Sequence, residues 1–365
     1  MVKSIENTLP ARIALVGCGA VSETLYAPVL QALESEQLAR VATLVDPSKP
    51  QRRTLEQIFP DAHSYEELTH CDLTNLDLVI IASPPRFHAD QTIFALEKSV
   101  PVLCEKPMAQ DSVQAQKMVE VSHQTKTPLA IGHFRRFFPA SKMLKAVFEQ
   151  KSFGELLNFS VQEGGKFAWG VASAALFSRD STPGGVLYDS GIHVIDLLLW
   201  WLGKPEDFTY EDDAMGGLEA NCLLEMTYPG GVRGMVRLSR DWSTQNRYLF
   251  SFERGTLLFE VGQANKLNLV IDGLPYILGG ELMKSNSPDG TIRLPTQTTL
   301  QSFGEQLRNV LRSIKGKESL MVPGDEAIHS LRFIEECYRR RRLMEMPWLT
   351  DDERCTAQQL ARGAR

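Results

Sequence analysis

Residues 11–22, ARIALVGCGAVS, form an apolar run that ends in glycines and other small residues. Such a run is typical of a buried parallel strand that leads into a helix. Similar apolar runs follow at 38–46, 76–85, 100–107 and 127–134, with helix-like patterns between them. Strands that alternate with helices predict βαβ units and a mostly parallel sheet. We expect this α/β domain to occupy residues 1–134.

The remaining chain, residues 135–365, shows a different pattern. Residues 155–164 and 219–278 are rich in strand signals, and two segments in this region are joined by Gly-Gly, as in a hairpin. Amphipathic helices follow near the end, and the last residues, 356–365, are expected to be a loosely held tail. The pattern predicts a second domain of α+β type with a mostly antiparallel sheet.

Composition limits the classes of partner. The chain of 365 residues carries a net charge of −6, with acids and bases mixed, whereas nucleic-acid binding needs a basic face. Its six cysteines include no C-x-x-C pair, which fits a reducing compartment. The N-terminal residues show no signal peptide, and no apolar stretch approaches the ~20 residues of a membrane helix. We expect a cytoplasmic protein with a small-molecule substrate and no nucleic-acid or membrane partner.

Residues 17–22, GCGAVS, stand between a strand and a helix, as a dinucleotide-binding loop requires. Gly17 would make the tight turn, and Gly19 would let the backbone approach a pyrophosphate at the helix N-terminus, next to Ala20 and Val21. Ser22 replaces the third glycine. Asp46 ends the second strand, where a carboxylate binds ribose hydroxyls and favours NAD, with NADP still possible. The alternative for Asp46 is a cap of the following turn or helix.

Two later loops should also face the cofactor, because ligands bind beyond the carboxyl ends of parallel strands. Ser83, Pro84 and His88 lie in ASPPRFHAD, and Glu105 and Lys106 lie in CEKPM. The alternative for Ser83 is a cap of the next helix. A lysine at the end of a buried strand is costly unless it is paired or functional, so Lys106 is a functional candidate.

The run GGVLYDSGIHVID, residues 184–196, places Asp189 and His193 four positions apart. On a helix these side chains share a face, and they could bind a metal, move a proton or satisfy each other in a core. No nearby pair of metal-binding residues completes a metal site, so we expect no metal. Asp196 is expected to be structural.

Taken together, GCGAVS, VDPSK, SPPRFH, EKPM and GGVLYDSGIHVIDLLLWWLG resemble the Gfo/Idh/MocA family along nearly the whole chain. These are NAD(P)-dependent dehydrogenases related to glucose–fructose oxidoreductase and inositol dehydrogenase. The resemblance implies a Rossmann domain followed by an α+β domain with a large, mostly antiparallel open sheet, and a homo-oligomer, either a dimer or a tetramer. It also implies that Lys106, Asp189 and His193 are the catalytic positions.

The implied chemistry is hydride transfer between nicotinamide and a secondary alcohol or ketone of a sugar, cyclitol or related polyol. The hydroxyl proton needs a base with a pKa near the working pH, and the imidazole of His193 fits. Asp189 would orient the ring, and Lys106 would stabilise negative charge on the oxygen. Substrate candidates are Arg135, together with Trp169 and Arg179 in the 164–185 loop, although core packing is an equal alternative for Trp169.

Two other functions share this pattern. One is a regulator of the same fold that binds NAD(P) and performs no chemistry, and the other is a glycosidase that uses NAD for transient oxidation. The regulator is disfavoured because the chain keeps Lys106, Asp189 and His193. The glycosidase begins with the same hydride step, so the sequence does not separate it from a dehydrogenase.

Overall fold

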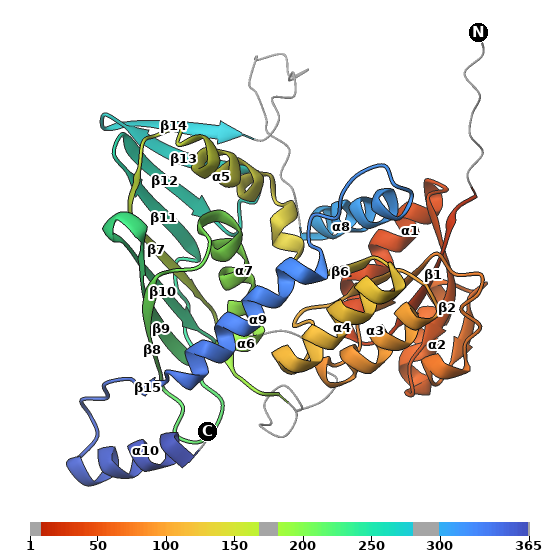
Figure 1. The fold of residues 1–365 in the computed structure, drawn as a ribbon, viewed down its shortest axis with the longest axis horizontal. Coiled ribbons are helices and arrows are strands. Elements are labelled where there is room, and N and C mark those ends of the chain that lie inside the picture. The colour runs from red at the N-terminus through yellow and green to blue at the C-terminus, as the bar shows by residue number, and fades with distance from the viewer. Residues whose placement is uncertain (1–8, 168–181, 280–298, 364–365) are drawn as a thin grey trace. The chain divides into compact units, whose positions relative to one another are not determined.

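The computed structural model describes residues 9–167, 182–279 and 299–363 (Figure 1). The chain divides into two compact units, which are described separately. Unit 1 comprises Met1–His133 and Thr299–Ile328, and unit 2 comprises Phe134–Thr298 and His329–Arg365.

Unit 1 is built on a six-stranded parallel sheet with the order β3-β2-β1-β4-β5-β6. Its strands are β1 (Ala11–Val16), β2 (Ala39–Val45), β3 (His63–Tyr65), β4 (Leu78–Ile81), β5 (Val102–Cys104) and β6 (Leu129–Ile131). All residues of β4 are buried, as expected for a central parallel strand covered on both faces. The expected Rossmann sheet is confirmed. The sequence did not reveal β3, because this short edge strand has no apolar run.

Helices cover both faces of this sheet. They are α1 (Ala27–Ser35), which follows a π-helical turn at Ser22–Tyr26, α2 (Lys49–Ile58), α3 (His88–Glu97), α4 (Ser112–Thr125) and α8 (Thr299–Ile314). The strand order runs outward from β1 in both directions. Right-handed crossovers therefore place α1 and α2 on one face and α3 and α4 on the other.

Helix α8 belongs to unit 1 although it lies far along the chain. It packs against α1 (Figure 1), where Tyr26 meets Phe303 edge to face with ring centroids 5.4 Å apart. The N–H of Ile131 donates to the carbonyl of Val322 at 3.1 Å. A continuous second domain over residues 135–365 therefore differs from the observed grouping. An amphipathic pattern shows that a helix has a buried face, but it does not show which sheet covers that face.

Unit 2 is built on a nine-stranded sheet with the order β14-β13-β12-β11-β7-β10-β9-β8-β15. Its strands are β7 (Leu156–Gly164), β8 (Asp207–Asp212), β9 (Asn221–Tyr228), β10 (Val232–Ser239), β11 (Arg247–Phe252), β12 (Gly255–Glu260), β13 (Lys266–Ile271), β14 (Leu274–Gly279) and β15 (Arg342–Leu343). Most neighbours are antiparallel, whereas β7 with β10 and β8 with β15 are parallel. The expected mostly antiparallel sheet is confirmed, including the Gly-Gly hairpin between β9 and β10.

One face of this sheet is covered by α5 (Pro139–Gln150), α6 (Val186–Asp189) and α7 (Gly191–Leu202), as Figure 1 shows. Trp201 on α7 packs edge to face against Tyr248 and Phe250 of β11, with ring centroids 5.9 and 5.8 Å apart. Its indole N–H donates to the carbonyl of Ser141 at 3.0 Å. Aromatic packing with a satisfied indole thus fixes α7 on the sheet.

The C-terminal helices are α9 (Gly324–Arg339) and α10 (Asp351–Gly363). The expected tail at 356–365 is helical up to Gly363, the last residue described, and the sequence analysis did not predict this helix. Thr350 and Glu353 form a capping box: the Thr350 N–H donates to the Glu353 carboxylate at 2.9 Å, and the Glu353 N–H donates to the Thr350 hydroxyl at 3.3 Å. This T-x-x-E spacing is the sequence signal that could have revealed the helix.

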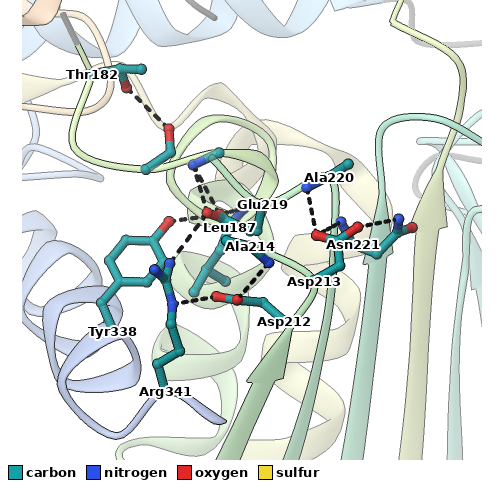
Figure 2. A network of polar contacts seen from close by, with 12 residues as sticks. Thr182, Leu187, Asp212, Asp213, Ala214, Glu219, Ala220, Asn221, Tyr338 and Arg341 are labelled. Atoms are coloured by element: carbon teal, nitrogen blue, oxygen red, sulfur yellow. Dashed lines mark hydrogen bonds and ion pairs between the residues drawn. The ribbon is translucent and has the colours of Figure 1, made fainter. Parts of the chain in front are cut away.

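A buried ionic network joins the edge of this sheet to the chain that follows α9 (Figure 2). Arg341 Nε lies 2.6 Å from Asp212 Oδ2 at the end of β8, and Arg341 Nη2 lies 3.6 Å from Glu219 Oε2. Both carboxylates have no exposed side-chain surface. Burial raises the pKa of Asp212 to about 6, and the nearby Arg341 only partly opposes this effect.

This raised pKa predicts a pH-dependent loss of stability. The folded protein holds the Asp212 proton more tightly than the unfolded chain does. The contribution of protonated Asp212 to the free energy of unfolding is therefore fully present at low pH and is lost as pH rises. Between the reference value of 3.8 and about 6, wild type should lose about 3 kcal/mol relative to Asp212→Asn. Urea unfolding of both proteins across this range measures the difference.

Asp207→Asn is the matched control, because Asp207 begins the same strand and its side chain is 77% exposed. The interpretation is wrong if the free energies of unfolding of wild type and Asp212→Asn keep a constant difference as pH rises.

Candidate active site

The glycine loop after β1 closely approaches the end of β4. Gly17 has a φ of +88°, and a Cβ at this position would lie 2.5 Å from the Ser83 nitrogen. Only glycine fits such a turn without strain. At Gly19, by contrast, a Cβ would meet nothing within 4 Å. The loop therefore has an open backbone surface at Gly19, next to Ala20 and Val21, as the approach of a pyrophosphate requires.

Asp46 organises the same edge of the sheet. Its carboxylate accepts the Cys18 N–H at 2.8 Å and the Ser48 N–H at 2.7 Å, and Arg52 donates to its carbonyl. The bond to the Ser48 N–H shows that Asp46 also caps the following turn, which was the alternative to ribose binding in the sequence analysis. A carboxylate has about four acceptor positions, so two known partners leave capacity for a ribose hydroxyl. The ribose contact itself stays a prediction.

His88 joins two of the loops expected at the cofactor. Its Nδ1 lies 2.9 Å from the Pro107 carbonyl oxygen, and its Nε2 lies 2.7 Å from the Ser83 carbonyl oxygen. The side chain is buried, and burial lowers its pKa. The ring thus lies between the loop after β4 and the loop after β5, and as a neutral imidazole it donates a hydrogen bond to one of the two carbonyls. The hydroxyl of Ser83 contacts the Gln91 side chain at 2.6 Å and makes no helix-cap bond.

Glu105 fixes the end of β5 from which Lys106 projects. Its carboxylate accepts the Tyr26 hydroxyl at 2.7 Å and the Lys106 N–H at 3.1 Å. A Cβ at Gly132 would lie 2.9 Å from Glu105 Oε1, so the neighbouring strand end also fits tightly around this carboxylate. Burial raises the pKa of Glu105. Lys106 itself is only partly buried and precedes a cis peptide bond to Pro107.

In unit 2 the run that carries Asp189 and His193 forms two helices instead of one. Asp189 ends α6, Gly191 begins α7, and Ser190 between them keeps helical φ and ψ angles of −84° and −38°. The His193 N–H donates to the Ser190 carbonyl at 3.2 Å. His193 is 6% exposed, and its ring meets that of Phe134 edge to face at 5.1 Å.

Arg240 is the contact that sequence reasoning missed. Its Nη2 lies 3.2 Å from Asp189 Oδ2, and the guanidinium stands over the ring of Phe167 at 5.8 Å. The two charged side chains are 10% and 24% exposed, so the pair is only partly screened by water. Arg240 follows β10, and no local pattern links it to α6. Arg240 reaches Asp189 only because strands that are distant along the chain pair with each other.

Two neighbouring arginines have structural partners. Arg135 Nη1 lies 2.6 Å from the Glu163 carboxylate on β7, and Tyr248 donates to the same oxygen. Arg136 makes a two-pronged contact with Asp196 on α7, at 2.9 and 2.8 Å, which agrees with a structural Asp196. A substrate role for Arg135 stays a prediction. Trp169 and Arg179, the other substrate candidates, lie outside the described residues.

Each unit thus holds a chemically distinct set of candidate groups. The loops of unit 1 offer open backbone, a carboxylate with spare acceptor positions and a lysine, which are compatible with a dinucleotide and a developing negative charge. The helices of unit 2 offer an imidazole close in sequence to a carboxylate that contacts a guanidinium. Among residues 9–167, 182–279 and 299–363, no group of three or more His, Cys, Asp and Glu is placed to hold a metal ion.

Comparison with known proteins places a domain boundary near residue 134, where the two units of the structure also first meet along the chain. The model of an oxidoreductase family with an NAD-binding Rossmann fold, GFO_IDH_MocA, matches residues 11–133, and its C-terminal domain model matches residues 141–258. The rhizopine catabolism protein MocA of Rhizobium meliloti is 29% identical over 238 residues, which are 63% of this chain and 71% of that protein.

Two further relatives extend over most of the chain. Inositol 2-dehydrogenase of Corynebacterium glutamicum (strain R) is 25% identical over 328 residues, 87% of this chain and 88% of that protein. The crystal structure of an aldose-aldose oxidoreductase from Caulobacter crescentus, complexed with glycerol, superposes with a TM-score of 0.76. That match is 20% identical and covers 91% of this chain and 97% of the other, so it shows a shared fold.

Proposed function

Because the chain belongs to the GFO/IDH/MocA family of NAD-binding oxidoreductases, we propose that its substrate is a secondary alcohol or ketone of a sugar, cyclitol or related polyol. The protein is an NAD(P)-dependent oxidoreductase. The observation that carries the proposal is the buried imidazole of His193, four residues after a carboxylate that Arg240 contacts. The name of its relative inositol 2-dehydrogenase supports a polyhydroxylated substrate.

Unit 1 supplies the binding site for the cofactor in this proposal. The open backbone at Gly19 receives the pyrophosphate, and the remaining acceptor positions of Asp46 receive the ribose hydroxyls. NAD is favoured over NADP, because a carboxylate at this position repels a 2′-phosphate. When bound, the nicotinamide accepts or donates the hydride.

His193 moves the proton. In the oxidation direction a ring nitrogen of His193 takes the hydroxyl proton while the carbon loses its hydride, and in the reduction direction it returns that proton. Asp189 orients the imidazole and stabilises its protonated form, and Arg240 fixes Asp189 by their ion pair. Lys106 stabilises the negative charge that develops on the substrate oxygen.

The further expectations about partners and location remain predictions. Buried and exposed residues alternate along β9 and β10, so the nine-stranded sheet has an exposed face there. Such a face fits the expected homo-oligomer, a dimer or tetramer. Within the part of the chain that the structure describes, no helix has the length and apolar character to cross a bilayer. The expectation of a cytoplasmic location rests on the cysteine pattern of the sequence.

The direct test is the absorbance of reduced nicotinamide, with purified protein, NAD or NADP, and a panel of myo-inositol, D-glucose, methyl glucosides and D-gluconate. We expect the signal to grow with one of these substrate groups and to be stronger with NAD. Tight NAD binding without turnover would favour the regulator instead. Cleavage of the methyl glucosides without net NADH would favour the glycosidase.

His193→Ala should lower turnover about a hundredfold or more, because the alcohol then has no base in place. The Kd for NAD should stay nearly unchanged, since the dinucleotide loops belong to unit 1. Steady-state kinetics and NADH fluorescence measure the two effects. His329→Ala, which removes an exposed imidazole from unit 2, is the control. Full turnover in His193→Ala would exclude the proposed proton transfer.

Asp46→Ala should weaken NAD binding about tenfold or more, the equivalent of one lost charged hydrogen bond. It should also reduce the preference for NAD over NADP, because the repulsion of a 2′-phosphate is removed. Titration of both cofactors by fluorescence measures the ratio of their Kd values. Asp61→Ala removes an exposed acid from the same unit and should change neither Kd. An unchanged cofactor preference in Asp46→Ala would contradict the ribose contact.

A further inference from the structure

We propose that Glu219 is a positioning residue for Asp189 and His193, and that it acts through the first turn of α6. Its two carboxylate oxygens accept the Gly185 N–H, both at 2.9 Å, and Oε1 also accepts the Leu187 N–H at 3.0 Å. The backbone carbonyl of Glu219 accepts the Val186 N–H at 3.0 Å. Three successive backbone donors at the start of α6 therefore end on one residue. This inference rests on the function proposed for Asp189 and His193.

The Gly-Gly pair before α6 is required by this contact. A Cβ at Gly185 would lie 2.0 Å from the Glu219 carbonyl oxygen, and a Cβ at Gly184 would lie 2.0 Å from the Tyr338 hydroxyl. At Gly185 the crowding atoms are backbone atoms of Glu219, so no larger side chain fits there without moving the backbone. At Gly184 they belong to the side chains of Tyr338 and Tyr188, which would have to move. The two glycines of GGVLYD are thus explained by the close approach of Glu219 and Tyr338 to the start of α6.

The carboxylate also contacts the end of α9 and the residues that follow it. The Tyr338 hydroxyl donates to Glu219 Oε1 at 2.7 Å, and Arg341 lies 3.6 Å from Oε2 (Figure 2). Arg341 is in turn fixed by Asp212 at 2.6 Å. A buried charge with several hydrogen bonds has a defined position, because losing any of them leaves a desolvated charge. Glu219 therefore gives α6 a fixed anchor.

The anchor reaches the candidate catalytic groups over a short path. Helix α6 is a single turn, and so short a helix depends on external contacts for its stability. Its last residue is Asp189, and the helical conformation of Ser190 leads directly into α7 and His193. A shift at Gly185 thus moves Asp189 relative to Arg240 and changes the surroundings of His193. Small displacements of this kind lower turnover without changing cofactor binding.

Tyr338→Phe is the mildest test, since it removes one donor to Glu219 and keeps the ring that packs edge to face against Tyr210. Tyr228→Phe is the matched control: the same change on a buried tyrosine of β9, whose hydroxyl contacts only Met226 Sδ, at 3.8 Å, among the hydrogen bonds of the described residues. In the full-length protein we expect Tyr338→Phe to lower kcat about threefold to tenfold. The Kd for NAD should change no more than in the control, whereas the unfolding midpoint should fall further than in the control, because a buried carboxylate loses one donor.

Glu219→Gln is the stronger variant, because an amide nitrogen replaces one of the oxygens that accept backbone N–H groups. We expect kcat to fall about tenfold to a hundredfold with the panel compound turned over fastest. The acid limb of the pH profile of kcat/KM should move to lower pH, because a displaced Asp189 stabilises the imidazolium of His193 less. A purely structural role would lower the fraction of folded enzyme and leave this limb in place.

A second readout needs no substrate. NMR of the full-length protein with labelled histidine and NAD reports the His193 ring, identified by its loss in His193→Ala. We expect its signal to shift in Tyr338→Phe and to stay in place in Tyr228→Phe.

An unchanged His193 signal and unchanged kcat in Tyr338→Phe would overturn the inference, even if Glu219→Gln fails to fold. If His193→Ala is inactive while both anchor variants keep full turnover, this inference alone is wrong. If His193→Ala stays active, the proposed function is wrong.

Discussion

The cost of removing charge from water constrains both units of this protein. A buried carboxylate or guanidinium is tolerated only where opposite charges or several hydrogen bonds replace its hydration. Asp196 therefore meets Arg136 with two bonds, and Glu105 is held by the Tyr26 hydroxyl and a backbone N–H. These contacts fix the elements that carry the candidate site: Glu105 directly follows β5, and α7 carries His193 together with Asp196. The charged groups that cost the most free energy to bury therefore hold these elements in well-defined positions.

The sequence is informative where local chemistry is decisive. The glycine loop and the apolar strands predicted the parallel sheet, because a buried strand followed by a tight turn leaves a recognisable pattern. The close approach at Gly17 and the position of Asp46 directly after β2 agree with that expectation. The functional pairing of Asp189 with His193 stays a prediction. The break between their helices at Ser190 was not predicted, because the residues around it keep a helical pattern.

The sequence is uninformative where partners are distant along the chain. Arg240 and Glu219 look like ordinary strand-end residues, and only the pairing of β10 with β9 and the packing of α6 against both strands give them roles. His88 was expected to line the cofactor cleft, yet both of its ring nitrogens face backbone carbonyls. A histidine in a loop carries no local signal that distinguishes a ligand contact from a bond between two loops.

The grouping of 299–328 with unit 1 has a consequence for how the protein is made. A ribosome produces the whole of unit 2 up to residue 298 before α8 emerges, so the nascent Rossmann sheet waits without the helix that covers Tyr26. During this interval the apolar surface of α1 is exposed, and such surfaces promote aggregation. The order of the chain thus separates the synthesis of the first part of the cofactor-binding unit from the synthesis of its last part.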